Sequence, residues 1–325
     1  MNNKLTLVAI ATSAALFAAG SAQAKTFRLA CPSAETSTTC KTASRFAELV
    51  GKNAEDIEIQ VFPGGQIGSG ESAIQQMRAG VIDLVVEDIS NYGNFLTDYN
   101  VVSWGFTFRD EQHFQDFLVS DLEAGMEEQL KDDQGIKIIA ANWRKLPRVV
   151  VSTTPVKTPE DLEGLKFRVP GIPSYIATWK TLGTNPTQVP WSDSFQALKT
   201  GVVDAMEAPL DSVLSQKFHV AAPNVSLTNH VFASISIAMN GKQWDALSEE
   251  QQRIMTDAAQ QAADYSAELA SEASSTIRSQ LEADGATVID VDRSAFAAKL
   301  KDAAHKQEVE GLWSEGLYDK IQAID

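Results

Sequence analysis

The sequence predicts an α/β fold of two similar lobes backed by one long helix, and three observations support this. Residues 27 to about 88 alternate between strand and helix patterns in the order βαβαβ, which is typical of a parallel sheet with right-handed crossovers. Residues 73–87 align without gaps on residues 194–208, so a similar unit occurs twice. A helical stripe of apolar residues then runs from about residue 254 to 281.

The N-terminus has the pattern of a secretory signal peptide. Lys4 supplies positive charge, residues 5–19 are apolar, and Ala22-Gln23-Ala24 fits a small-residue cleavage site. We therefore expect residues 1–24 to be removed after Ala24 and the mature chain to begin at Lys25. The apolar run is short for a membrane span, and no later run is long and apolar enough, so no direct membrane insertion is expected after cleavage. The remaining chain is long enough for two domains.

The charge of the chain limits the partners it can have. The formal net charge is -16 and is spread along the sequence, which argues against nucleic acid or an anionic membrane surface, because both favour basic patches. A small anionic ligand remains compatible, since a local arginine outweighs a distant surface field that salt screens.

The chain has two cysteines, Cys31 and Cys40. In an oxidising compartment outside the cytoplasm, a disulfide across this short loop is expected. Two free, buried thiols are the alternative.

The first unit begins with a strand, a helix and a second strand, followed by a glycine-rich turn, a helix and a third strand. The strands are expected at residues 27–30, at 57–61 and from Val81, and the helices around 43–50 and through Met77. The glycine-rich turn is expected at 63–70. A phosphate-binding loop would need lysine where Glu71 stands, and a carboxylate there would repel phosphate. The glycines are therefore interpreted as a tight turn between strand and helix.

The second unit contains a segment that ends by placing one arginine at the end of a strand. Thr158 is expected to cap a short helix that starts at Pro159, with Asp161 completing a capping box and Gly164 ending the helix. A strand over 165–169 then carries Arg168. Ligands bind at the carboxyl ends of strands in open α/β sheets, and a guanidinium there can hold a carboxylate with two hydrogen bonds. A solvated arginine at a strand end is the alternative.

Further binding candidates flank this arginine. Arg148 opens the strand R-V-V-V-S, which we expect to neighbour the strand that Arg168 closes. Trp191 offers a flat apolar wall to a ligand, or else belongs to the core.

The repeated unit adds candidates on both lobes. The alignment makes Glu87 and Ala208 equivalent, at strand ends that face one cleft. Glu87 and Asp88 are expected on opposite faces of their strand, which makes them a poor acid/base couple. One of them is expected to accept hydrogen bonds from ligand hydroxyl or amine groups.

Motifs for metal or covalent chemistry do not occur. The four histidines are scattered, neither a zinc motif nor a G-x-S-x-G nucleophile motif is present, and no cofactor or metal is expected. His230, beside Asn229, is interpreted as a structural residue with satisfied hydrogen bonds rather than a base.

A long helix follows the second unit. Ser248 and Gln251 form a capping box, and Gly285 ends the apolar stripe. At about 1.5 Å per residue the helix is on the order of 55 Å long, far more than one small domain needs. It is expected to back both lobes, with pairing to another chain as the alternative, and residues 293–324 are expected to add closing helices.

An ordered set of motifs resembles one protein family, the solute-binding proteins of tripartite ATP-independent periplasmic (TRAP) transporters, of the dicarboxylate-binding type. The set is P-E-D-L-E-G-L-K-F-R-V-P, L-G-T-N-P-T-Q-V-P-W, A-L-K-T-G-V-V-D-A-M-E-A-P and L-T-N-H, with weaker agreement in F-A-E-L-V and F-P-G-G-Q-I-G-S-G-E. The resemblance covers nearly the whole mature chain. It implies a periplasmic, type II-like protein, expected to be a monomer and not an enzyme, whose lobes close by a hinge around a small organic acid and deliver it to TRAP membrane permease subunits.

The resemblance also implies roles for particular residues. The main carboxylate-binding arginine of the family falls on Arg168, the second arginine on Arg148 and an aromatic wall on Trp191. The family's asparagine in E-N-P is replaced in Glu207-Ala208-Pro209, which puts sialic-acid-like specificity in doubt and suggests compensation by Glu87.

The expected division of the chain places lobe I at 25–147 plus about 234–273 and lobe II at 148–233 plus about 274–325. A secreted sensor that presents its ligand to a membrane receptor and a periplasmic enzyme using the same cleft are the alternative functions.

Overall fold

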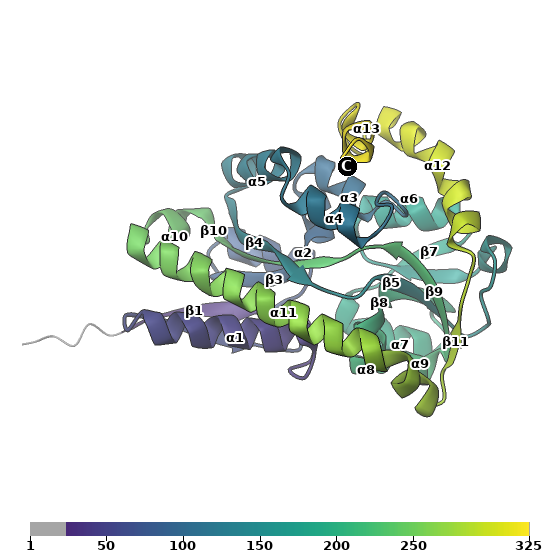
Figure 1. The fold of residues 1–325 in the computed structure, drawn as a ribbon, viewed down its shortest axis with the longest axis horizontal. Helices are drawn as coiled ribbons and strands as arrows, with labels where there is room; N and C mark the ends of the chain where they lie inside the picture. The colour runs from purple at the N-terminus through teal and green to yellow at the C-terminus, as the bar shows by residue number, and fades with distance from the viewer. Residues whose placement is uncertain (1–23, 325) are drawn as a thin grey trace, which may run out of the picture.

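The computed structural model describes residues 24–324 and contains two β-sheets, each covered by helices (Figure 1). The predicted signal peptide, residues 1–24, lies outside the described residues except for Ala24. We call the part built on the first sheet lobe I and the part built on the second sheet lobe II. In strand order, the first sheet is β2-β1-β3-β10-β4 and the second is β11-β9-β5-β8-β6-β7.

The strands of lobe I are β1 (Lys25–Ala30), β2 (Ile57–Phe62), β3 (Leu84–Asp88), β4 (Ile136–Arg144) and β10 (Ser234–Asn240). Those of lobe II are β5 (Arg148–Ser152), β6 (Lys166–Val169), β7 (Asn185–Gln188), β8 (Ala205–Pro209), β9 (Asn224–Val231) and β11 (Thr287–Ile289). The α-helices are α1 (Thr38–Asn53), α2 (Glu71–Arg78), α3 (Asn100–Ser103), α4 (Glu111–Leu118), α5 (Asp121–Gln134), α6 (Pro173–Thr181), α7 (Ser194–Lys199), α8 (Leu210–Ser215), α9 (Phe218–Ala221), α10 (Gly241–Asp245), α11 (Glu249–Ala283), α12 (Arg293–Val309) and α13 (Leu317–Gln322). The 3-10 helices of residues 24–324 are η1 (Ile89–Asn94), η2 (Thr97–Tyr99), η3 (Pro159–Leu162) and η4 (Trp191–Asp193).

The predicted parallel pairing of the first three strands is confirmed, since β1 pairs in parallel with both β2 and β3. The third strand begins at Leu84 rather than at Val81. Gly80 has φ 71° and ends the helical segment, and Val81 in the following turn is 52% exposed. The predicted helix at Pro159 is a single 3-10 helix, in which Asp161 accepts the backbone N–H of Thr158 at 2.8 Å.

The internal repeat is visible in the fold. The ungapped alignment carries β3 residue for residue onto β8, and α2 onto η4 and α7. Asp83 and the equivalent Asp204 serve the same purpose in their lobes, because each accepts a backbone N–H from the neighbouring strand, from Arg28 at 2.7 Å and from Lys166 at 3.0 Å. The aspartate that the two repeats share therefore stabilises the fold of each lobe.

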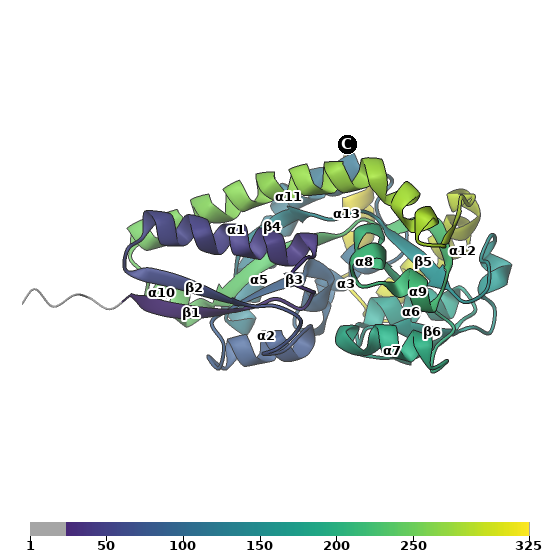
Figure 2. The same ribbon diagram turned by 90° about the horizontal axis from the view of Figure 1, so that it is seen from below.

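Two chain crossings and one helix connect the lobes. The chain passes from β4 to β5 and returns from β9 to β10. Helix α11 packs on α1 and β4 in lobe I and on α8 and β11 in lobe II, so it runs behind both lobes as predicted (Figure 2). Its predicted capping box is present, with Ser248 and Gln251 exchanging hydrogen bonds of 2.9 and 3.2 Å.

The C-terminal helices contact both lobes. Helix α12 packs on α6 and β9, whereas the carbonyls of Gln322 and Ile324 accept hydrogen bonds from Arg109 at 2.9 and 2.6 Å. The rings of Trp104 and Trp313 lie 5.9 Å apart at this junction. The residue boundaries expected for the two lobes stay a prediction.

A disulfide joins Cys31 and Cys40, whose Cα atoms are 5.9 Å apart. It links the end of β1 to the first turn of α1. Within residues 24–324, none of the helices combines the length and the apolar character that crossing a membrane requires.

Candidate binding cleft

A cleft of about 810 Å³ lies between the lobes and takes its walls from both. Lobe I contributes the glycine-rich turn, the start of α2 and the end of β3 with the following η1. Lobe II contributes Arg148 of β5, Arg168 of β6, the start of α6 and η4. Because β3 and β6 run toward the cleft, their carboxyl ends deliver side chains to it, as is typical of open α/β sheets.

Within residues 24–324, Arg168 is a buried cation without a carboxylate partner. The residue is 2% exposed, and its single hydrogen bond within the described chain runs from Nε to the carbonyl of Val189 at 2.9 Å. The guanidinium carbon lies 5.6 Å from the centre of the Trp191 ring. Burial, together with the nearby charge of Arg148, lowers the pKa of Arg168 to about 10, although Glu207 acts in the opposite direction. The group remains charged at neutral pH and has terminal nitrogens left for a ligand.

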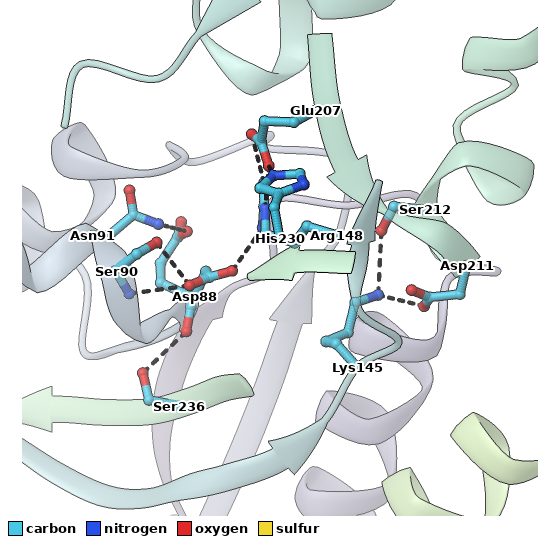
Figure 3. A network of polar contacts seen from close by, with 11 residues as sticks. Asp88, Ser90, Asn91, Lys145, Arg148, Glu207, Asp211, Ser212, His230 and Ser236 are labelled. Atoms are coloured by element: carbon cyan, nitrogen blue, oxygen red, sulfur yellow. Dashed lines mark hydrogen bonds and ion pairs between the residues drawn. The ribbon is translucent and has the colours of Figure 1, made fainter. Parts of the chain in front are cut away.

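Arg148, in contrast, already has two carboxylate partners (Figure 3). Its Nε and Nη2 donate to the two oxygens of Glu207, the latter at 2.9 Å, and its Nη1 donates to Asp88 Oδ2 at 2.9 Å. Burial alone would lower the pKa of Arg148, but Glu207 and Asp88 raise it above its ordinary value. The charge that was expected to bind a ligand carboxylate is thus balanced inside the protein.

The expectation that the two arginines lie on neighbouring strands was wrong. Strand β8 lies between β5 and β6, and it pairs antiparallel with β5 and parallel with β6. Both arginines still line the same cleft.

Glu207 is a central residue that sequence reasoning missed. It is fully buried, and although burial alone would raise its pKa, Arg148 and His230 lower it to about 2. His230 Nε2 lies 3.7 Å from Glu207 Oε2 and has no hydrogen bond to any of the described residues, while Nδ1 shares one of 2.8 Å with Thr228. The interpretation of His230 as fully satisfied was therefore wrong for one ring nitrogen, and burial lowers the pKa of this histidine.

Ala208 does not line the cleft. It is completely buried in the apolar core of lobe II, against Val149 and Met206 among others, because successive residues of a strand point to opposite faces. The repeat alignment is correct in making it equivalent to Glu87, but the side chain at this position turns away from the ligand space.

Glu87 and Asp88 both line the cleft, and the expectation that they lie on opposite faces of their strand stays a prediction. The strand ends at Asp88, whose Oδ1 accepts the N–H of Ser90 at 3.0 Å and starts η1. Glu87 accepts the Gly70 N–H at 2.6 Å and the Asn91 amide at 3.2 Å. Burial and then Asp88 raise the pKa of Glu87 to about 8 against the effect of the Gly70 hydrogen bond.

Two aromatic side chains complete the lobe II wall. Trp191 lines the cleft, and its ring also meets Phe218 edge-on at 5.2 Å. Tyr175, which sequence reasoning missed, is buried under the Arg148 guanidinium at 5.3 Å, and its hydroxyl has no hydrogen bond in the described chain. The sequence signal that could have identified Tyr175 is its position in the first turn of α6, the helix that follows β6.

The third cation of the cleft is Lys145, in the crossing between β4 and β5. It forms an ion pair with Asp211 of α8 and donates to Ser212 at 3.2 Å and to Thr38 at 3.0 Å. Thr38 of α1 also donates to Asp211 at 2.5 Å, so this cluster joins both lobes beside the cleft. Across residues 24–324, no group of three or more metal-ligating side chains is placed to hold a metal ion.

Comparisons with known proteins show the family of this chain. Residues 30–310 match the family model described as bacterial extracellular solute-binding protein, family 7. The chain is 30% identical to the 2,3-diketo-L-gulonate-binding periplasmic protein YiaO of Escherichia coli K12, over 96% of this chain and 94% of that protein.

Solved structures extend the similarity to the fold. A TRAP periplasmic solute-binding protein of Roseobacter denitrificans with bound L-galactonate superposes with a TM-score of 0.86 and 27% identity, covering 93% of this chain and 99% of that one. One of Fusobacterium nucleatum with bound sn-glycerol-3-phosphate gives 0.86 and 26%, covering 92% and 96%. The chain therefore belongs to family 7 of the bacterial extracellular solute-binding proteins, the periplasmic solute-binding proteins of TRAP transporters.

Proposed function

We propose that this protein captures a small organic acid in the cleft between its lobes and delivers it to the membrane permease of a TRAP transporter. The observation that carries the proposal is Arg168. A buried guanidinium normally has a carboxylate partner, because removing a charge from water is costly. Within the described chain this one has none, and it lines the cleft. A ligand carboxylate supplies the missing partner.

The surroundings of Arg168 fit this role. Trp191 supports the guanidinium from the side, Val189 fixes its Nε, and the unpaired hydroxyl of Tyr175 belongs to the same wall. These contacts hold the arginine before a ligand arrives, so that little side-chain entropy is lost on binding. Of the three proteins named above, YiaO and the protein of Roseobacter denitrificans are described with the carboxylates 2,3-diketo-L-gulonate and L-galactonate, which supports the same class of ligand for this chain.

Two measurements test the proposal. Mass spectrometry of ligand released from the purified, unfolded protein is expected to find an organic acid, which isothermal titration calorimetry then tests on the ligand-free protein. Arg168→Ala is expected to weaken binding about 100-fold or more, because it removes hydrogen bonds to a charged group. Arg168→Lys keeps the charge but loses the two-pronged geometry, so an intermediate loss is expected.

The exposed Arg253 on α11, whose ion pairs in the described part of the chain are with Glu250 and Asp257 of its own helix, provides the control. Arg253→Ala is expected to bind like the wild type. Unchanged affinity in Arg168→Ala would overturn the assignment of the carboxylate-binding residue. Recovery of the ligand chemically altered after incubation would instead favour the enzyme alternative.

A further inference from the structure

More acidic than basic side chains line the cleft. Three cations line it, namely Lys145, Arg148 and Arg168, and so do four carboxyl groups, those of Glu71, Glu87, Asp88 and Asp193. Lys145 is paired with Asp211, and Arg148 with Glu207 and Asp88. Within residues 24–324, the cleft thus offers one cation that is not already paired with a carboxylate.

The lobe I wall is built around a buried carboxyl group. Glu87 is 3% exposed, and each of its two oxygens already accepts a hydrogen bond, from Gly70 or from Asn91. Asp88 follows directly in the chain and lines the same wall. A second negative charge on a ligand would meet these carboxyl groups with no free cation beside them, which is a costly arrangement in a buried site.

Uncharged polar side chains occupy much of the remaining surface. They donate and accept hydrogen bonds and can match ligand hydroxyl groups; among those of the cleft are Ser33, Ser69, Gln75, Asn91, Asn94 and Gln188. The volume of about 810 Å³ is within the ordinary range for sites that hold small molecules.

From these contacts we propose that the cleft selects hydroxylated acids with a single negative charge and rejects diacids, with Glu87 as the residue that determines this specificity. The inference rests on the proposed function, since Arg168 must hold the one carboxylate. This selectivity distinguishes the protein from family members that bind doubly charged ligands. Family members share the fold, whereas the number of unpaired cations in the cleft is set by each chain's own sequence.

Matched pairs of acids test the proposal. Each pair has the same carbon chain and stereochemistry and differs only in whether the far end is a CH₂OH group or a carboxylate: L-galactonate with galactarate, D-gluconate with D-glucarate, and D-erythronate with meso-tartrate. Titration calorimetry at pH 8.5 is expected to show that at least one monoacid binds. It is also expected to show each bound monoacid binding at least 10-fold more tightly than its diacid.

Variants then assign the discrimination to Glu87. Glu87→Gln keeps the size of the side chain and an acceptor for Gly70, and is expected to bring the affinity ratio of monoacid to diacid at least 3-fold closer to one. The exposed Glu48→Gln on α1 is the control and is expected to keep the wild-type ratio. An unchanged ratio in folded Glu87→Gln would overturn the role of Glu87, and the wild-type ratios test the selection itself without any variant.

The outcomes distinguish this inference from the proposed function. A diacid that binds the wild type as tightly as its monoacid, and loses affinity in Arg168→Ala, overturns the single-charge selection while the organic-acid function stands. Failure of every acid in the panel to bind overturns the hydroxylated-acid class. If the ligand released from the purified protein is also not an acid, the proposed function fails with it.

Discussion

Asp88 of lobe I and Arg148 of lobe II form an ion pair across the cleft, with Asp88 Oδ2 at 2.9 Å from Nη1. Glu207 of β8 holds the other side of the same guanidinium. The contact therefore ties β3 of one lobe to β5 and β8 of the other, and it exists only while the lobes are close together. Retention of a ligand in the cleft depends on the same closeness.

We expect Asp88→Asn to release bound ligand faster. The amide oxygen can still cap η1 through Ser90, but the charge that attracts Arg148 is lost. A charged hydrogen bond contributes about 1.5–3 kcal/mol, so the dissociation rate should rise roughly 10-fold or more. Stopped-flow tryptophan fluorescence measures it. Ser90→Ala, which alters the hydroxyl beside Asp88 without removing the ion pair, serves as the control, and an equal effect of both variants would contradict the account.

Glu207 is expected to make the stability of the protein depend on acid pH. Its pKa is lowered to about 2 from 4.5, so its contribution is complete above about pH 4.5 and is lost as the pH falls toward 2. Chemical unfolding between pH 6 and pH 3 should show the wild type losing more stability than Glu207→Gln. At pH 7, Glu207→Ala should cost about 3–5 kcal/mol, because it leaves Arg148 without its main partner. Equal pH profiles for wild type and Glu207→Gln would refute the assigned pKa.

Glu123 is expected to make the stability of the protein depend on pH in the opposite direction. This buried residue of α5 accepts the Tyr99 hydroxyl at 3.0 Å, and burial together with Glu127 raises its pKa to about 9. The folded state favours the protonated form, so stability is complete below about pH 4.5 and is lost as the pH rises toward 9. Glu123→Gln is neutral at all pH values and is expected to be more stable than the wild type at pH 8.5, with a smaller difference at pH 5. A difference that does not grow with pH speaks against this prediction.

The Cys31–Cys40 disulfide is expected to stabilise the fold by roughly 2.5 kcal/mol through the short loop that it closes. Urea unfolding with and without a reducing agent measures this contribution. The double variant Cys31→Ser/Cys40→Ser should match the reduced wild type and be insensitive to the reducing agent. Because the loop also positions Thr38 against Asp211 of lobe II, ligand affinity should fall in the reduced protein. Equal unfolding curves for the oxidised and reduced forms would contradict the prediction.

The sequence predicted those parts of the fold that local signals determine. Gly164 and Pro170 delimit β6, Ser248 starts α11, and the repeated helix-turn-strand unit marks β3 and β8. The insertion of β8 between β5 and β6 could not be predicted in this way. Strand order depends on pairs such as Arg148 with Pro209 and Arg168 with Met206, which are distant in the sequence.

The candidate site could be predicted only in part, because its residues also come together through strands that are distant in the sequence. Arg168 follows from its position at a strand end, but the partners of Arg148 come from β3 and β8, and no local pattern connects these strands to β5. One available signal was overlooked. In the strand M-E-A-P, Met206 and Ala208 are apolar, so alternation places Glu207 on the other face. That reading would have placed Glu207, rather than Ala208, among the candidate site residues.

The most direct test of the central claim is a crystal structure of the protein with its co-purified ligand. We expect a ligand carboxylate within about 3 Å of the Arg168 terminal nitrogens, with Arg148 still bonded to Glu207 and Asp88. A carboxylate bound instead to Arg148 or Lys145, with Arg168 making no contact to the ligand, would contradict it.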